Sequence, residues 1–240
     1  MIKDQRRKEI LSAIIEEYGI TAEPVGSQVL VEKYGFEFSP ATVRNEMLIL
    51  ERQGYIFQPY TSAGRVPTDK AFRFYVNEVT TPKPLSEKER CSFERLFEIA
   101  EASPNQFIKE TIRQVATFSK NLSLFCLLEK DRFFSAGFSE LLKYPEFQEL
   151  EKTMSIFEFF DEAEQELEIL FEEIENKTSI FIGHENPIKK FREFSMITTG
   201  SDLISGERII LGILGSKRMN YAKNISLVEE ATKNIKNNLK

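Results

Sequence analysis

Ser39-Pro-Ala-Thr-Val-Arg-Asn-Glu-Met47, followed by Tyr60-Thr-Ser-Ala-Gly-Arg-Val-Pro-Thr-Asp-Lys70, is the part of this chain that decides its fold. Ser39 with Pro40 is typical of a helix start, because the serine oxygen accepts a free backbone N–H and proline suits the first turn. We therefore expect a helix that begins after Ser39 and runs to about Arg52. The second stretch predicts a tight turn over residues 61–65.

Two more helices are expected before this one. Apolar residues recur with helical spacing over residues 3–18, and Gly19 should end that helix. Ser27 is a plausible cap for a second helix that runs through Tyr34. Only residues 35–38 separate it from Ser39, and a helix, a four-residue turn and a helix is the spacing of a helix-turn-helix.

The residues after the third helix predict a two-stranded wing. Residues 55–60 are expected to form a strand, residues 61–65 a turn, and Thr68 to cap a helix through Val79. Gly64 suits a turn that needs a positive φ, and its backbone could also approach a phosphate closely. The first 80 residues are therefore predicted to form a winged helix-turn-helix, a fold that binds DNA.

The two faces of the helix after Ser39 differ in character. At about 100° per residue, Val43, Met47 and Leu50 share one face, which should pack on the first two helices. Arg44 and Asn45 lie on the opposite face and can bind guanine and adenine, respectively, through two hydrogen bonds. Phosphate contacts are expected from the end of this helix and from the wing. The DNA contacts predicted from residue chemistry are Pro40, Thr42, Arg44, Asn45, Arg52, Thr61, Ser62, Gly64 and Arg65.

The rest of the chain predicts a second domain of α+β class. Residues 79–85 contain two prolines and form the clearest linker. A capping box at residues 86–89 starts a helix to about residue 102, and a second helix covers residues 106–119. Strands are expected at residues 122–128, 179–182, 194–198 and 208–214, with helices at residues 146–175 and 221–239. The predicted domains are residues 1–80, a connecting segment of residues 81–121, and residues 122–240.

Composition excludes several function classes. The net charge is −6, and residues 1–80 carry ten Lys or Arg against eleven Asp or Glu, so DNA binding must depend on a local concentration of arginine. No apolar run is long enough to span a membrane, and no signal peptide is expected. Cys91 and Cys126 are isolated, which favours reduced thiols in the cytoplasm. His184 is the only histidine, so neither a metal site, a cofactor nor an enzymatic centre is expected.

Several short stretches occur in the order found in one known family. In the first half these are Glu23-Pro-Val-Gly-Ser27, the two stretches quoted above and Tyr75-Val. In the second half they are Leu141-Leu with Pro145-Glu-Phe147, Ile182-Gly-His-Glu-Asn186, and Leu211-Gly-Ile-Leu-Gly-Ser-Lys-Arg-Met-Asn-Tyr221. On these stretches the chain resembles the HrcA-type heat-inducible transcription repressors.

The resemblance implies a repressor of heat-shock chaperone operons of the groE and dnaK type. Such a protein would bind an inverted-repeat operator in double-stranded DNA (the CIRCE element) as a homodimer, with its activity supported by the GroEL chaperonin. It also implies that a GAF-like domain follows the winged helix. By position in the family pattern, the DNA-contacting residues would be Ser39, Thr42, Arg44, Asn45, Thr61, Ser62 and Arg65.

The chain departs from the family in its middle. Typical members are longer between the strand at residues 122–128 and the segment at residues 133–147, where the family carries an inserted dimerising domain. Here residues 129–132 connect the two directly, so we expect a reduced GAF-like mixed α/β domain without the insertion. A dimer interface would then have to come from residues 86–119 or from the remaining sheet.

Two other functions are consistent with the sequence. A winged-helix regulator that senses a small molecule would need an apolar pocket with convergent polar groups in residues 122–240. A protein-only adaptor could bind a chaperonin through residues 146–175, which hold twelve acidic residues and one lysine. Residues 146–175 could equally present a solvated helix face.

Overall fold

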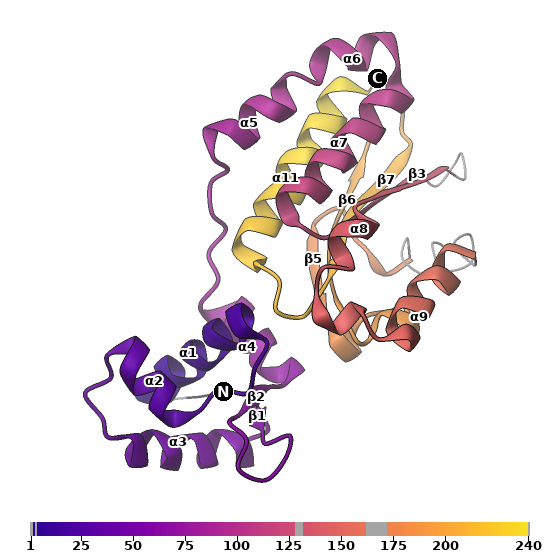
Figure 1. The fold of residues 1–240 in the computed structure, drawn as a ribbon. Coiled ribbons are helices and arrows are strands. Elements are labelled where there is room, and N and C mark those ends of the chain that lie inside the picture. The colour runs from indigo at the N-terminus through magenta and orange to yellow at the C-terminus, as the bar shows by residue number, and fades with distance from the viewer. Residues whose placement is uncertain (1, 3, 128–131, 162–171, 240) are drawn as a thin grey trace. The chain divides into compact units, whose positions relative to one another are not determined.

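The structure is a computed structural model that describes residues 2, 4–127, 132–161 and 172–239. The chain divides into two compact units, residues 1–81 and residues 82–240. Figure 1 shows the first unit in indigo and violet and the second in magenta to yellow. Each unit has its own core, and each is described by itself below.

The first unit consists of three helices, a short hairpin and a fourth helix (Figure 1). The two strands of the hairpin are antiparallel, with Ile56 opposite Pro67 and Phe57 opposite Val66. Leu11, Ile14 and Leu30 are fully buried between the helices. In chain order the elements are α1 (Gln5–Thr21), α2 (Ser27–Tyr34), α3 (Pro40–Arg52), β1 (Ile56–Phe57), β2 (Val66–Pro67) and α4 (Asp69–Glu78).

Local capping explains most of these boundaries. The Ser39 side chain accepts the backbone N–H of Thr42 at 3.2 Å and starts α3, as predicted. Thr68 does the same for α4. Gly35 ends α2 with a φ of 64°, a conformation that glycine adopts without the strain a side chain would add.

Three boundaries predicted from the sequence are wrong. Helix α1 passes through Gly19 and ends at Thr21; the cap residue Ala22 has a φ of 59° and donates its N–H to the carbonyl of Tyr18. Ser27 does not cap α2, because Gly26 holds the cap position and Ser27 is a buried residue of the first turn. The strand expected over residues 55–60 is only two residues long, since its second half belongs to the hairpin loop.

The second unit is built on a five-stranded sheet in the order β4-β3-β7-β6-β5, and every neighbouring pair is antiparallel. Its strands are β3 (Leu122–Leu127), β4 (Arg132–Ala136), β5 (Thr178–Ile182), β6 (Ser195–Asp202) and β7 (Arg208–Gly215). Its helices are α5 (Glu87–Glu94), α6 (Phe97–Ala102), α7 (Pro104–Ser119), α8 (Phe138–Leu141), α9 (Leu150–Asp161) and α11 (Tyr221–Asn238), with short 3-10 turns η2 (Pro145–Phe147), η3 (Gly183–Glu185) and η4 (Lys189–Phe191).

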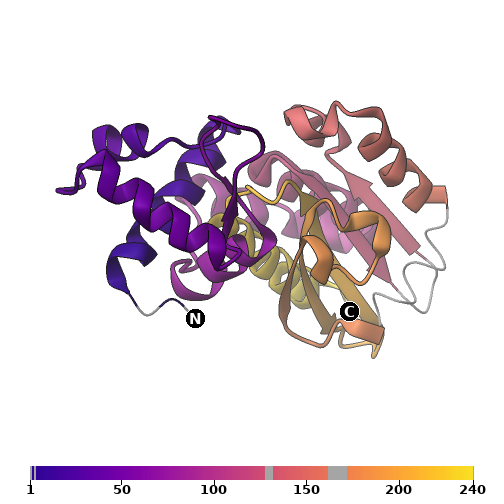
Figure 2. The same ribbon diagram turned by 90° about the horizontal axis from the view of Figure 1, so that it is seen from below.

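Helices cover both faces of this sheet. The long helices α7 and α11 pack together on one face (Figures 1 and 2). The other face holds an apolar core in which Phe147 stacks on Phe194 at 4.6 Å between ring centroids. Cys126 lies in this core, and burial raises the pKa of its thiol far above the usual value, so it is a packing residue.

The α+β class predicted from the sequence is confirmed, with strands at all four predicted positions. The capping box at Ser86 is also confirmed. Strand β4 was not predicted, and the helix expected over residues 86–102 is divided into α5 and α6. The helix expected over residues 146–175 is wrong at its start, because a 3-10 turn precedes α9; residues 162–171 of that prediction lie outside the described residues. No helix in the described part of the chain is long and apolar enough to cross a membrane.

Candidate nucleic-acid interface

Helix α3 presents one buried and one exposed face, as its sequence predicts. Val43, Met47 and Leu50 are at most 4% exposed and pack into the first unit. The opposite face is open to solvent because residues spaced by three or four positions share one side of a helix. Its exposed residues are Pro40, Ala41, Arg44, Asn45, Leu48 and Arg52.

The beginning of α3 is organised by two hydroxyl groups. Ser39 is exposed, and its side-chain oxygen lies 3.0 Å from the hydroxyl oxygen of Thr42, which is half-buried. Ser39 therefore caps the helix start, because its side chain accepts the Thr42 N–H and its carbonyl accepts the Val43 N–H. The N-terminus of a helix carries a partial positive charge and favours a phosphate group.

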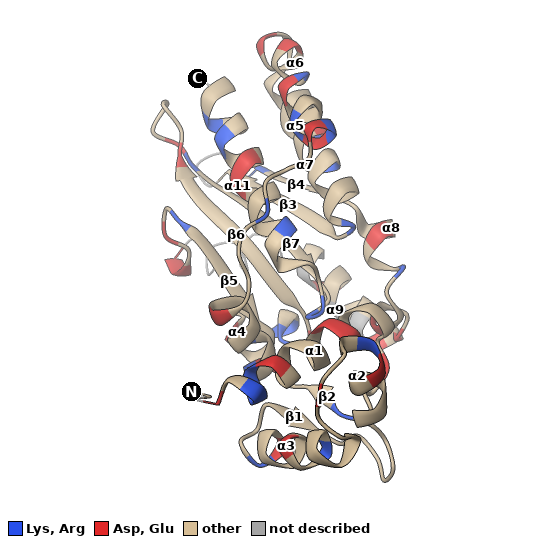
Figure 3. Ribbon diagram, turned by 90° about the vertical axis from the view of Figure 1, so that its left-hand side faces the viewer, with Lys and Arg blue, Asp and Glu red and all other residues tan. Residues whose placement is uncertain are grey.

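The two arginines of α3, Arg44 and Arg52, are not paired with the acidic residues of the same helix. Glu46 is bound by Arg7 at 2.7 Å, and its carboxylate also lies 3.7 Å from Arg6. The hydrogen bond to Glu46 raises the pKa of Arg7. Among the described residues, Arg44 and Arg52 have no hydrogen-bond or ion-pair partner. The ribbon of α3 carries both blue and red segments in Figure 3. Glu46 is paired with arginines of α1, whereas Arg44 and Arg52 have no partner among the described residues.

The loop of the hairpin, residues 58–65, exposes small polar side chains. Thr61 and Ser62 are both exposed, and the Gln58 side chain donates to the carbonyl of Ala63 at 3.0 Å. Ser62 adopts a φ of 69°, which serine rarely does. The sequence prediction had assigned the positive φ of this turn to Gly64, and that assignment is wrong.

Gly64 has a different role, which is close packing against the segment before α2. A Cβ on Gly64 would lie 2.4 Å from the carbonyl carbon of Val25. The next residue, Arg65, exchanges two backbone hydrogen bonds with Val25, at 2.8 and 2.9 Å. Two of the sequence stretches that carry the family resemblance are therefore in direct contact.

Arg65 is placed differently from Arg44. Its side chain is only 12% exposed and forms an ion pair with Glu51 of α3 at 3.0 Å. A phosphate contact by Arg65 remains a prediction and would require the guanidinium to bind a phosphate beside or instead of Glu51. The structure thus brings Arg44, Asn45 and Arg52 onto one open face, and it draws Arg65 inward.

Sequence reasoning missed the pairs that hold this surface together. Arg7 and Glu46 are 39 positions apart, so no local pattern indicates that they meet. Lys70 donates to the carbonyl of Gln53 at 2.7 Å and lies over the ring of Tyr55 at 4.5 Å, which fixes the end of α3. The sequence signal for a structural role of Lys70 was its place at the end of the second quoted stretch, residues 60–70.

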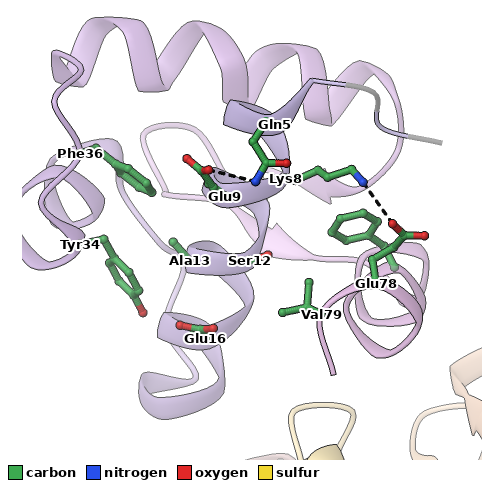
Figure 4. Close-up of a pocket in the computed structure, with 11 residues that line it drawn as sticks. Gln5, Lys8, Glu9, Ser12, Ala13, Glu16, Tyr34, Phe36, Glu78 and Val79 are labelled. Atoms are coloured by element: carbon green, nitrogen blue, oxygen red, sulfur yellow. Dashed lines mark hydrogen bonds and ion pairs between the residues drawn. The ribbon is translucent and has the colours of Figure 1, made fainter. Parts of the chain in front are cut away.

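A groove of about 510 Å³ lies elsewhere in the first unit, between α1, α4 and the turn after α2 (Figure 4). Tyr34 and Phe36 form one side, and the ion pair of Lys8 with Glu78, at 3.1 Å, lies opposite. The carboxylates of Glu9 and Glu16 also line this groove, and like charge would repel a phosphate backbone. DNA contact is therefore better placed on α3 and the hairpin.

Motifs of the second unit are explained by packing. The Asn186 side chain donates to the carbonyls of Gly183, Phe191 and Phe194 at 2.9 to 3.0 Å, which shapes the loop after β5. Arg218 binds Glu146 through two nitrogens, at 2.9 and 3.1 Å. Among the described residues no group of His, Cys, Asp or Glu is arranged to hold a metal ion.

Comparisons with known proteins place the chain among related sequences and structures. The family model described as "HrcA protein C terminal domain" matches residues 37–225. A "Heat-inducible transcription repressor HrcA" from Beutenbergia cavernae is 45% identical over 123 residues, 51% of this chain and 35% of the relative. The chain thus matches about a third of that relative's length.

Two further similarities extend over nearly the whole chain. A protein of the same name from Desulfitobacterium hafniense is 26% identical over 337 residues, which cover 98% of this chain and 97% of the relative. Because that alignment is longer than 240 residues, the relative contains segments without a counterpart here. A solved structure titled "Crystal structure of a hypothetical protein at 2.2 A resolution" shares the fold, with a TM-score of 0.76, 20% identity and 98% of both chains covered. The family model covers most of the sequence, and this chain belongs to the HrcA family.

Proposed function

We propose that this chain is a DNA-binding transcriptional repressor of heat-shock chaperone operons. The observation that carries the proposal is the open face of α3, on which Arg44 and Asn45 are exposed and have no partner among the described residues. The name "Heat-inducible transcription repressor" of its relatives supports the same function. This function requires a binding surface and no catalytic centre.

In this proposal the first unit is a winged helix-turn-helix. Helices α2 and α3 form the helix-turn-helix, α3 enters the major groove, and the β1–β2 hairpin is the wing. The second unit is a GAF-like domain that lacks the insertion of longer relatives. Arg44 and Asn45 read base edges, and the phosphate contacts are made by the helix start, the end of α3 and the hairpin. The contacting residues are Ser39, Pro40, Thr42, Arg44, Asn45, Arg52, Thr61, Ser62, Gly64 and Arg65.

The operator in this proposal is a CIRCE-like inverted repeat, and the protein binds it as a homodimer in the cytoplasm. A symmetric dimer matches a two-fold operator because its two reading helices are related by the same axis. A GroEL-type chaperonin is the proposed protein partner. The light-scattering mass of the free chain, compared with 27.8 kDa for one copy, tests the dimer independently of DNA.

The central experiment measures binding to a labelled inverted-repeat duplex by fluorescence anisotropy. A duplex with scrambled half-sites is the specificity control, and the salt concentration is held fixed because phosphate contacts make affinity salt-dependent. Arg44→Ala and Asn45→Ala should each weaken operator binding by about 1–3 kcal/mol, roughly 5- to 150-fold, and reduce the preference for the operator.

The matched control is Arg113→Ala, which removes an arginine that is 65% exposed in the second unit. This variant should bind the operator as the unchanged protein does. If Arg44→Ala and Asn45→Ala also bind unchanged, α3 does not read DNA through this face. If the unchanged protein binds operator and scrambled duplex equally, it is not a sequence-specific repressor.

A further inference from the structure

The second unit contains a cavity of about 570 Å³ that the proposed repressor function does not use. It lies at the end of the sheet where β3 and β6 stop, and α6, α7 and the end of α11 enclose it. In Figure 1 this region is near the C-terminal label, beside α6. Its volume is in the range of pockets that hold small molecules, about 300–1,000 Å³.

The floor of the cavity is apolar and belongs to the folded core. Its residues come from α6, α7, β3, the residues after β6, and the chain end after α11, and all are less than 9% exposed. They are Ala100, Ile108, Phe125, Leu127, Leu203 and Leu239. An apolar molecular body that enters this cavity would remove apolar surface of both partners from water.

The rim of the cavity is polar, and its arginine pairs with no carboxylate of the described residues. Arg132, at the start of β4, is exposed and donates to the side-chain oxygen of Asn105 at 2.9 Å. Asn105 is neutral, and in the described part of the chain no carboxylate lies within ion-pair distance of Arg132. Two carboxylates, Glu101 and Glu207, also line the cavity. Glu101 is exposed, and the Glu207 carboxylate accepts the Ser205 hydroxyl at 3.0 Å.

We propose that this cavity binds an amphipathic carboxylate, with an aromatic or aliphatic body of about ten carbons on the floor and the carboxylate on Arg132. The planar guanidinium matches a carboxylate through two parallel hydrogen bonds, which a neutral or cationic head group cannot form. The apolar floor selects the body of the ligand and the arginine selects its head group. This site is independent of DNA binding.

The test uses three probes with the same ring system and different head groups: naphthoate, naphthylmethanol and naphthylmethylammonium. Binding to the full chain is measured by isothermal titration calorimetry, and ligand-induced shifts in melting temperature provide a second readout. Naphthoate should bind at least about tenfold more tightly than the alcohol, because a charge-assisted hydrogen bond adds to the same apolar contact. Tighter binding of the ammonium probe, or equal binding of acid and alcohol, would overturn the proposal.

Three variants locate the site. Arg132→Gln should weaken naphthoate binding about tenfold or more and leave naphthylmethanol binding unchanged. Ala100→Phe should weaken both, since it fills the floor. Arg113→Gln, an arginine on α7 outside the cavity, should change neither. Melting curves without ligand verify that each variant is folded. The assignment is wrong if Arg132→Gln and Arg113→Gln bind naphthoate alike.

Discussion

Arg65 of the hairpin and Glu51 of α3 form an ion pair with 3.0 Å between Nη2 and Oε2. The two side chains are 12% and 30% exposed, so water screens the pair only partly. The pair connects the hairpin to the helix that we propose reads DNA. Arg65 therefore combines a structural contact with a proposed phosphate contact, and the two can be separated by substitution.

Arg65→Ala should lower the free energy of unfolding by about 1–3 kcal/mol, since it leaves the Glu51 carboxylate without its partner. Arg44→Ala should change it by less than about 0.5 kcal/mol, because Arg44 is exposed and has no partner among the described residues. Urea titration of the two variants measures both values. Equal stabilities would show that the Arg65–Glu51 pair contributes nothing to the fold.

Gly64→Ala should destabilise the first unit by about 1–3 kcal/mol, because its Cβ would clash with the backbone of Val25. Gly26→Ala is the matched control in the neighbouring segment. Its φ is −89° and no atom lies within 4 Å of the added Cβ, so the change should stay within about 0.5 kcal/mol. Urea unfolding of both variants tests the difference; a Gly64→Ala protein as stable as Gly26→Ala would refute the packing role.

The roles of Gly35 and Gly64 differ in how well the sequence predicts them. Ser39, Thr68 and Gly35 act through neighbours a few positions away, and local rules therefore predicted the helix boundaries they set. Gly64 is explained by Val25, which is distant in sequence, and no turn rule contains that contact.

The candidate site was likewise predictable where it depends on neighbouring residues and not where it depends on distant ones. The open face of α3 was predictable because it depends only on helical periodicity. Which of its charges are available was not predictable, because Glu46 and Glu51 are neutralised by Arg7 and Arg65 from other elements. Strand β4 was missed because none of its residues is fully buried, so its sequence lacks the pattern of a core strand. Its strand structure comes from its pairing with β3.

Arg52→Gln should reduce the salt dependence of operator binding. A side chain that neutralises one phosphate contributes about 0.9 to the slope of log affinity against log salt concentration. Arg52 is exposed and unpaired among the described residues, so it is available for such a contact. Anisotropy titrations over a series of salt concentrations measure the slope. Arg90→Gln, at a 62% exposed arginine of the second unit, should keep the slope of the unchanged protein, and an unaltered slope in Arg52→Gln would remove that residue from the interface.

Glu146 should make the second unit sensitive to acid. Burial raises its pKa, but the hydrogen bonds from Arg218 and Ser216 outweigh that effect and hold the pKa below the usual 4.5. A carboxyl group whose pKa is lowered by folding stabilises the protein above its unfolded pKa, and this contribution is lost as the pH falls through the folded value. The unchanged protein should therefore lose stability below about pH 4.5 more steeply than Glu146→Gln. Denaturant unfolding of both proteins from neutral pH down to pH 3 measures the difference, and parallel curves would show that the Glu146–Arg218 pair does not couple folding to protonation.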